Sequence, residues 1–255
     1  SPKNSRGVIM AEELNGKTAL VTGSGRNIGR ATAIELGRLG AKVVVNSRSN
    51  EKEARSVCEE IISAGGTAIP ILADVAVESE ISTMFETIHK EFGPTHILIN
   101  NAGLREESNI SEMSNEEWER VMGVNLNGPF YCARKAVPGM IADGWGRIIN
   151  VSGLNAFKGR PGWSHVCASK MGALGLTRAL SMELARYGIS VNHIVPGAFD
   201  TSRDGPSPVA DTSNIPVGRL GLPEEIAKTV GFLVSEGANY INGQTIHVNG
   251  GALTY

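Results

Sequence analysis

Short apolar runs that alternate with longer amphipathic runs constrain the fold of this chain more than any other feature. Each apolar run is bounded by glycine or polar residues, as expected of buried strands in a parallel sheet. These runs are 17–22, 42–46, 68–74, 96–100, 146–152, 189–195 and 243–248. The helical runs are 28–39, 51–64, 78–92, 114–142, 164–187 and 223–235, the last with proline at its start. The alternation predicts a doubly wound α/β fold, with a parallel sheet and helices on both faces.

Length and composition narrow the class of protein. The 255 residues suit a single Rossmann domain at 13–255, and the polar residues 1–12 are expected to be a flexible leader or foreign to the natural protein. The formal net charge of −2 argues against nucleic acid or an anionic membrane as a partner, and no apolar run could span a bilayer. Three widely spaced cysteines indicate a reducing compartment, so we expect a cytoplasmic protein. The five histidines show no ligand spacing, so no metal site is expected.

A glycine-rich turn, TGSGRNIGRA at 22–31, follows the first predicted strand and precedes the first predicted helix. In this context backbone N–H groups and a helix N-terminus can bind a pyrophosphate, although a tight strand–helix turn alone would also use glycine. The candidate contacts in the turn are Gly23, Gly25, Arg26, Asn27, Ile28 and Gly29.

The end of the second predicted strand indicates which dinucleotide would bind. A carboxylate there binds the ribose 2′-hydroxyl of NAD, whereas a cation suits the 2′-phosphate of NADP. The sequence VVVNSRS has no carboxylate at this point but places Ser47 and Arg48 there. Arg26 in the glycine turn could reach the same phosphate. Either arginine alone could simply be solvated, but two that converge on one site favour NADP(H).

Six ordered motifs carry a resemblance to a known family. They are TGSGRNIG (22–29), ADV (73–75), NNAG (100–103), GVNLNG (123–128), ASK (168–170) and VNHIVPGAFDT (191–201). With them the chain resembles the short-chain dehydrogenase/reductase family, and most of all its 3-oxoacyl-carrier-protein reductase type, from about Leu14 to the end. The resemblance implies a nicotinamide cofactor, a small-molecule substrate and a homotetramer with helices 114–142 and 164–187 at one subunit contact.

The resemblance also implies further contacts with the cofactor. Asn27 stands at a position where the family has glycine, and asparagine tolerates the left-handed backbone better than most residues. By position, Asp74 and Val75 match the adenine contacts, Asn101, Ala102 and Gly103 the ribose segment, Lys170 the ribose-holding lysine, and Pro196, Gly197 and Thr201 the carboxamide contacts.

The catalytic positions of the family are only half preserved. Asn125 and Lys170 match its asparagine and lysine, but Val166 stands where the family has its proton-donating tyrosine, and Gly153 where it has its serine. Ser152 is one residue early, and one residue's shift on a strand turns the side chain to the opposite face. A positioned general acid contributes about 10²–10⁴-fold, so this arrangement should impair ordinary ketone reduction.

Other side chains could supply the missing chemistry. His165 adjoins the vacated position, although its side chain should point about 100° around the helix and so pack elsewhere. Asn155 would face the pocket if the strand before it continued, and a loop is the alternative. Arg105 could meet an anionic substrate, or be solvated. Trp163 and Phe199 could form aromatic walls, or belong to the core.

Four interpretations of the site stay open. The chain could be an NADP(H) oxidoreductase with a rearranged acid, or with an acceptor such as an iminium carbon that needs none. It could be a lyase, hydrolase or cyclase built on the same pocket. It could be a cofactor-binding protein without turnover, or a slow ketoreductase that uses water and Lys170. The loop 201–214, which lacks periodicity, is expected to be a surface loop or a substrate lid.

Overall fold

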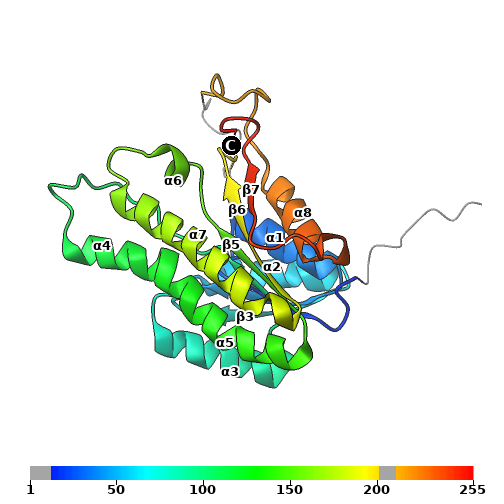
Figure 1. Cartoon of the computed structure of the whole chain (residues 1–255). Helices are drawn as coiled ribbons and strands as arrows, with labels where there is room; N and C mark the ends of the chain where they lie inside the picture. The colour runs from blue at the N-terminus through cyan, green and yellow to red at the C-terminus, as the bar shows by residue number, and fades with distance from the viewer. Residues whose placement is uncertain (1–12, 201–210, 255) are drawn as a thin grey trace, which may run out of the picture.

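In the computed structural model, which describes residues 13–200 and 211–254, seven parallel strands form one sheet in the order β3-β2-β1-β4-β5-β6-β7 (Figure 1). The strands are β1 (Thr18–Val21), β2 (Lys42–Ser47), β3 (Thr67–Leu72), β4 (Ile97–Asn100), β5 (Gly146–Val151), β6 (Ile189–Pro196) and β7 (Thr245–Val248). This confirms the doubly wound Rossmann fold predicted from the alternation of apolar and amphipathic runs.

Helices cover both faces of the sheet. They are α1 (Asn27–Arg38), α2 (Glu51–Ser63), α3 (Glu78–Phe92), α4 (Asn115–Met122), α5 (Gly128–Asp143), α6 (Asn155–Lys158), α7 (Ser164–Leu184) and α8 (Pro223–Val234). Buried residues of α1, α2 and α8 pack in one core cluster, and those of α3, α5 and α7 in a second on the opposite face (Figure 1). Strand β1 shows why: Ala19 and Val21 enter the first cluster, whereas Leu20 between them enters the second.

The strand order determines where the sheet can bind a ligand. Strand β1 pairs with β2 on one side and with β4 on the other, so the chain winds outward in both directions from this point. All strands are parallel, so the segments that follow β1, β2, β4, β5 and β6 meet at the same edge. A crevice at such a switch point is where open α/β sheets bind their ligands.

The prediction of one continuous helix over 114–142 is wrong in one respect that matters for the site. The structure divides it into α4 and α5 by a π-helical segment, Gly123–Asn127, which carries Asn125. In a π-helical segment the backbone hydrogen bonds run from i to i+5 and not from i to i+4, and such segments often occur at functional sites. There are two smaller differences. Strand β5 ends at Val151, one residue before the predicted end, and helix α6 was not predicted.

Three predictions fall partly on residues outside the described ranges. Residues 1–12, Thr201 and the section 201–210 of the predicted lid are not described. Within the described residues, no helix is both long and apolar enough to cross a membrane. The same residues contain no cluster of three histidine, cysteine or acidic side chains that could hold a metal ion.

Candidate functional site

The glycine turn lies between β1 and α1, and its backbone adopts the conformation that its sequence anticipates. Gly23 has φ +61°, and a Cβ there would lie 2.9 Å from the Cα of Ala102. A Cβ on Gly29 would lie 2.4 Å from the carbonyl oxygen of Gly23. Asn27 has φ +50°, so the prediction that asparagine takes the left-handed conformation here is confirmed. The turn is therefore closely packed, and it leads into the N-terminus of α1.

Two asparagines, the buried Asn46 and the half-buried Asn101, hold this turn against the neighbouring strands. Asn101 Nδ2 donates to the carbonyl oxygens of Thr22 (3.0 Å) and Gly23 (3.1 Å). Asn46 Oδ1 accepts from the N–H of Gly23 at 3.1 Å, while its Nδ2 donates to the carbonyl of Ala73 at 3.1 Å. Asn46 thus ties the ends of three strands together. This role of Asn46 was not predicted; the only sequence signal for it is a polar residue at the end of the apolar run VVVN.

A cavity of about 630 Å³ opens beside the turn. At what we name the turn end, it is lined by the segments after β1, β2 and β3 and by the start of the segment after β4. These lining residues are Gly23, Gly25, Arg26, Asn27, Ile28, Gly29, Asn46, Ser47, Arg48, Ser49, Asn50, Glu53, Ala73, Asp74, Val75, Asn101 and Ala102. Arg26 and Arg48 are exposed here, and neither forms an ion pair with a described residue. Both guanidinium groups are available to an anion.

The opposite end of the cavity, which we name the lysine end, is formed by segments after β4, β5 and β6 and by α7. Its lining residues are Gly103, Leu104, Arg105, Val151, Ser152, Gly153, Leu154, Asn155, Ala156, Trp163, Val166, Lys170, Pro196, Gly197, Ala198 and Phe199. Val124, on the π-helical segment, also lines the cavity. The two ends together contain every described residue that the sequence predicted at the cofactor.

Lys170 is the central charged group of the lysine end. Its side chain is buried, and its Nζ donates to the carbonyl oxygen of Val151 at 2.9 Å. Burial and, secondarily, the charge of Arg105 lower the pKa of Lys170 to about 8. A lysine with this pKa can release a proton as the ammonium or accept one as the amine close to neutral pH, unlike an ordinary surface lysine.

Gly153 and Val166 face the same end of the cavity as Lys170. A Cβ on Gly153 would meet no described atom within 4 Å, so the position has space for a side chain. Val166 is buried and offers only methyl groups. The hydroxyl of Ser152 is buried and has no described hydrogen-bond partner, so it is not presented to the cavity as a donor. Apart from Lys170 and Arg105, no described side chain lining this end is ionisable.

Asn125 supports the site from behind the cavity. On the π-helical segment it is 1 % exposed and does not line the cavity. Its Oδ1 accepts from the N–H of Leu104 at 2.8 Å, and its Nδ2 donates to the carbonyl of Leu104 at 3.0 Å and to Ser169 Oγ at 3.1 Å. In this structure Asn125 is therefore a positioning residue that clamps the loop after β4 to helix α7.

Sequence comparison relates this site to known proteins. A family model for enoyl-(acyl carrier protein) reductase matches residues 23–253. The 3-oxoacyl-[acyl-carrier-protein] reductase FabG of Staphylococcus aureus is 41% identical over 241 residues, which cover 92% of this chain and 97% of that protein. FabG of Pseudomonas aeruginosa is 39% identical over 242 residues, or 93% and 98% of the two chains. The chain belongs to the short-chain dehydrogenase/reductase family.

Solved structures of the same family superpose on the whole domain. A double mutant of a short-chain dehydrogenase/reductase from Serratia marcescens gives a TM-score of 0.89 at 31% identity, and the match covers 94% of this chain and 99% of that one. A gluconate 5-dehydrogenase from Burkholderia cenocepacia, in complex with NADP and tartrate, gives 0.86 at 33% identity, with 95% and 97% covered. This short-chain dehydrogenase/reductase is thus related over more than nine-tenths of its length to reductases and dehydrogenases.

The two remaining candidate catalytic residues, His165 and Asn155, differ in their relation to the cavity. His165 is fully buried and does not line the cavity, since it points to another side of α7 from Val166. Its position does not support a role as replacement proton donor. Asn155 lines the cavity, but β5 does not continue to it, because the chain turns into the short helix α6. The carbonyl of Asn155 accepts from Cys167 Sγ at 3.3 Å, which holds α6 against α7.

The predicted aromatic walls are present. Trp163, at the start of α7, and Phe199, after β6, both line the lysine end. The Phe199 ring packs over Gly221, where a Cβ would lie 2.5 Å from the ring. Arg160 lies 4.4 Å from the centre of the Trp163 ring, in cation–π distance. The lysine end therefore combines apolar walls with two cations.

Proposed function

We propose that this protein is an NADP(H)-dependent oxidoreductase whose active site has no side-chain acid at the usual tyrosine and serine positions. The observation that carries the proposal is the continuous cavity at the switch point. At one end this cavity contains the glycine turn and two arginines that form no ion pair with a described residue, and at the other it contains Lys170, Gly153 and Val166. Family membership supports redox chemistry, and the residues at 153 and 166 suggest that its proton step differs.

The residues present fit a dinucleotide with a 2′-phosphate. The turn at Gly23–Gly29 offers backbone N–H groups and the N-terminus of α1 to a pyrophosphate. Arg26, Ser47 and Arg48 would bind the 2′-phosphate, since guanidinium groups pair with phosphate through two hydrogen bonds. By resemblance, Asp74 and Val75 would contact the adenine, and Pro196, Gly197 and Thr201 the carboxamide. When bound, NADPH would supply a hydride at the lysine end.

Lys170 is the group best placed to handle the proton. Reduction of a carbonyl by hydride leaves an alkoxide, which must be stabilised and protonated. With Val166 and Gly153 unable to act, Lys170 is the ionisable side chain of the lysine end whose pKa lies near neutrality. It could stabilise the developing charge directly or relay a proton through water. An acceptor that is already protonated, such as an iminium carbon, would need no acid at all.

The experiment is a calorimetric titration of the protein with NADPH and with NADH. We expect NADPH to bind at least about 10-fold more tightly, because two charge-assisted contacts to phosphate are available. Arg48→Gln should remove most of that preference and leave NADH binding unchanged. Arg55→Gln is the matched control, since Arg55 is exposed on α2, paired with Glu51, and does not line the cavity. Failure to bind either nucleotide would contradict the proposal.

Turnover then separates the remaining interpretations. Loss of NADPH absorbance with a cyclic-imine panel, but slow loss with a ketone panel, is expected if the acceptor needs no acid. Ketone reduction should rise when Gly153→Ser and Val166→Tyr are introduced together. Turnover of a substrate with no change in NADPH absorbance would indicate a non-redox enzyme. Nucleotide binding without any turnover would indicate a silent binding protein.

A homotetramer is part of the proposal. Apolar side chains are exposed along the helices that the resemblance assigns to a subunit contact, with Trp118 on α4, Phe130 and Ile141 on α5, and Met171 on α7 between 37 and 43% exposed. Association of two copies through these helices would cover them. Sedimentation should give about four times the 27.0 kDa of the chain, and Phe130→Glu should shift it to a smaller species.

A further inference from the structure

We propose that Arg105 forms an anion site at the lysine end of the cavity, and that the substrate of this enzyme carries a carboxylate. The inference rests on the proposed function, because it names the substrate class for the same cavity. It depends on how the loop after β4 is fixed, on the pairing of its neighbouring acids, and on the charges that line this end.

The backbone that carries Arg105 is held in place although it has no regular secondary structure. The preceding residue, Leu104, is bonded at both its N–H and its carbonyl by the buried side chain of Asn125, at 2.8 and 3.0 Å. Gly103, one residue further back, approaches Lys170 so closely that a Cβ on it would lie 3.1 Å from Nζ. The loop therefore presents Arg105 from a fixed position beside the ammonium group of Lys170.

The sequence around Arg105 is REE, yet its two acidic neighbours do not neutralise it. Glu106 pairs with Arg120 on α4. Glu107 pairs with Arg160, at 3.2 Å. Arg105 itself is exposed, lines the cavity and forms no ion pair with any described residue. Both nearby carboxylates are thus bound to other arginines, which leaves Arg105 available for an external anion.

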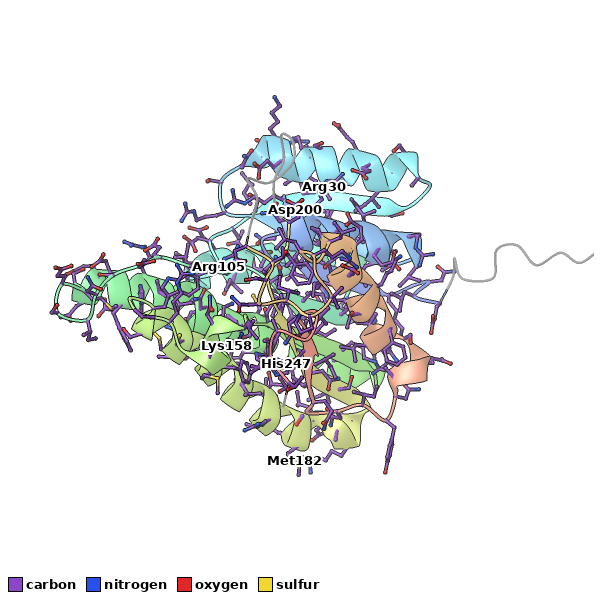
Figure 2. All side chains as sticks on the ribbon, turned by 90° about the horizontal axis from the view of Figure 1, so that it is seen from above. Arg30, Arg105, Lys158, Met182, Asp200 and His247 are labelled. Carbon is purple, nitrogen blue, oxygen red and sulfur yellow. The ribbon has the colours of Figure 1, made fainter. Side chains whose placement is uncertain are left out.

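The lysine end has two cations and, among its described lining residues, no carboxylate. The two acids that line the cavity, Glu53 and Asp74, belong to the turn end. Asp200 follows Phe199 but does not line the cavity, and Figure 2, seen from above, shows it well separated from Arg105. The charge of Arg105 is felt at Lys170, whose pKa it helps to lower. A carboxylate beside Arg105 would relieve this repulsion.

The shape of a suitable substrate follows from the same walls. Trp163, Phe199, Leu154 and Val166 provide apolar surface, so a carboxylate attached to a ring or short apolar chain would use both features. Arginine pairs with carboxylates through two parallel hydrogen bonds, which would fix the orientation of such a molecule relative to Lys170.

The test uses benzoate and benzamide, which have nearly the same shape and differ in charge. Each is titrated by calorimetry into the NADPH-loaded protein, in which the anion-binding turn end is already filled. We expect benzoate to bind at least about 10-fold more tightly than benzamide, as one charge-assisted bidentate contact provides. Arg105→Gln should bring the two affinities together, and Arg105→Lys should retain part of the preference.

The matched control is Lys158→Gln. Lys158 is an exposed cation on α6 that does not line the cavity. If this variant lowers benzoate binding as much as Arg105→Gln does, the effect is one of general surface charge and the Arg105 site is refuted. Equal binding of benzoate and benzamide by the unaltered protein refutes it as well.

Failure of this inference can be told apart from failure of the proposed function. Arg105→Gln should bind NADPH with unchanged affinity, which also shows that the variant is folded. If the unaltered protein binds no nucleotide, the same titrations are done without it. A benzoate preference that Arg105→Gln alone abolishes would then support the anion site while the proposed cofactor fails.

Discussion

Replacing Lys170 by methionine should change how the stability of this protein depends on pH. Methionine keeps much of the volume of the buried side chain but removes its charge. Lys170 is buried at the lysine end, and burial lowers its pKa from the ordinary 10.5 to about 8. The fold therefore favours the neutral amine, whereas the unfolded chain binds a proton up to about pH 10.5.

The size of the effect follows from the two pKa values. Each pKa unit corresponds to about 1.4 kcal/mol, so below pH 8 the charged lysine destabilises the apo fold by about 3 kcal/mol. Between pH 8 and 10.5 the unfolded chain holds more protons than the fold, so this penalty is released as pH rises. From pH 7.5 to 9.5 the unfolding free energy of the unaltered protein should gain about 2 kcal/mol relative to Lys170→Met.

The hydrogen bond to Val151 does not obscure this difference. Both the charged and the neutral amine can donate to the Val151 carbonyl, at 2.9 Å in the structure. Its loss in the methionine variant costs about 1–3 kcal/mol at every pH, so it shifts the comparison without changing its slope.

Urea unfolding of the cofactor-free proteins at matched concentration, from pH 7.5 to 9.5, measures the slope. Lys158→Met is the control, since Lys158 is exposed on α6 and its removal should leave the slope unchanged. A constant difference between the unaltered protein and Lys170→Met across this range would refute the argument. It would mean that Lys170 is fully solvated or paired with an anion in the apo protein.

Three further predictions concern the scaffold around the site. Asn27→Val should lower the unfolding free energy by about 1–2 kcal/mol in urea, because φ is +50°, whereas Asn27→Gly should be neutral. Asn125→Ala breaks the clamp on Leu104; it should cost about 1–3 kcal/mol, and faster amide hydrogen exchange at Leu104 should report the loosened loop. Burial, with smaller effects of Lys170 and His247, lowers the pKa of His193 to about 3. The fold therefore loses about 2 kcal/mol as pH falls from 6.5 to 5, and His193→Phe should flatten this loss.

The strands and most helices could be predicted because their burial is periodic in the sequence. Strand β4 (ILIN), for instance, is buried along its full length and reads as an almost continuous apolar run. The left-handed backbone at Asn27 followed from residue type and the turn context alone. These features depend on contacts that are local or that repeat at a fixed period.

The features that were missed depend on contacts between distant segments. The π-helical segment at Gly123–Asn127 lies within an unbroken helical pattern, and its position becomes meaningful only because Asn125 bonds to Leu104, 21 residues away. Asn46 is a similar case, since its partners lie on the turn after β1 and beyond β3. Helix α6 has four residues, too few to show a period.

The absence of a side-chain acid that we propose for positions 153 and 166 and the cations at the lysine end bear on the same step. Positive surroundings disfavour the binding of a free iminium cation, yet they favour any step that creates negative charge, such as hydride addition to a neutral carbonyl. A carboxylate on the substrate, held by Arg105, would offset the first effect. A protonated cyclic imine that bears a carboxylate would then bind as a molecule without net charge. Hydride addition to its cationic carbon would complete the reduction without a proton from the protein, so no acid would be needed at positions 153 and 166. On this reasoning the charge at Arg105 and Lys170, and not the absence of hydroxyl groups at positions 153 and 166, determines which acceptors the cavity selects.

The sharpest comparison is therefore between a carboxylated cyclic imine and its uncarboxylated parent. The first should be reduced at least about 10-fold faster at subsaturating concentration, and equal rates would contradict the role of the two cations.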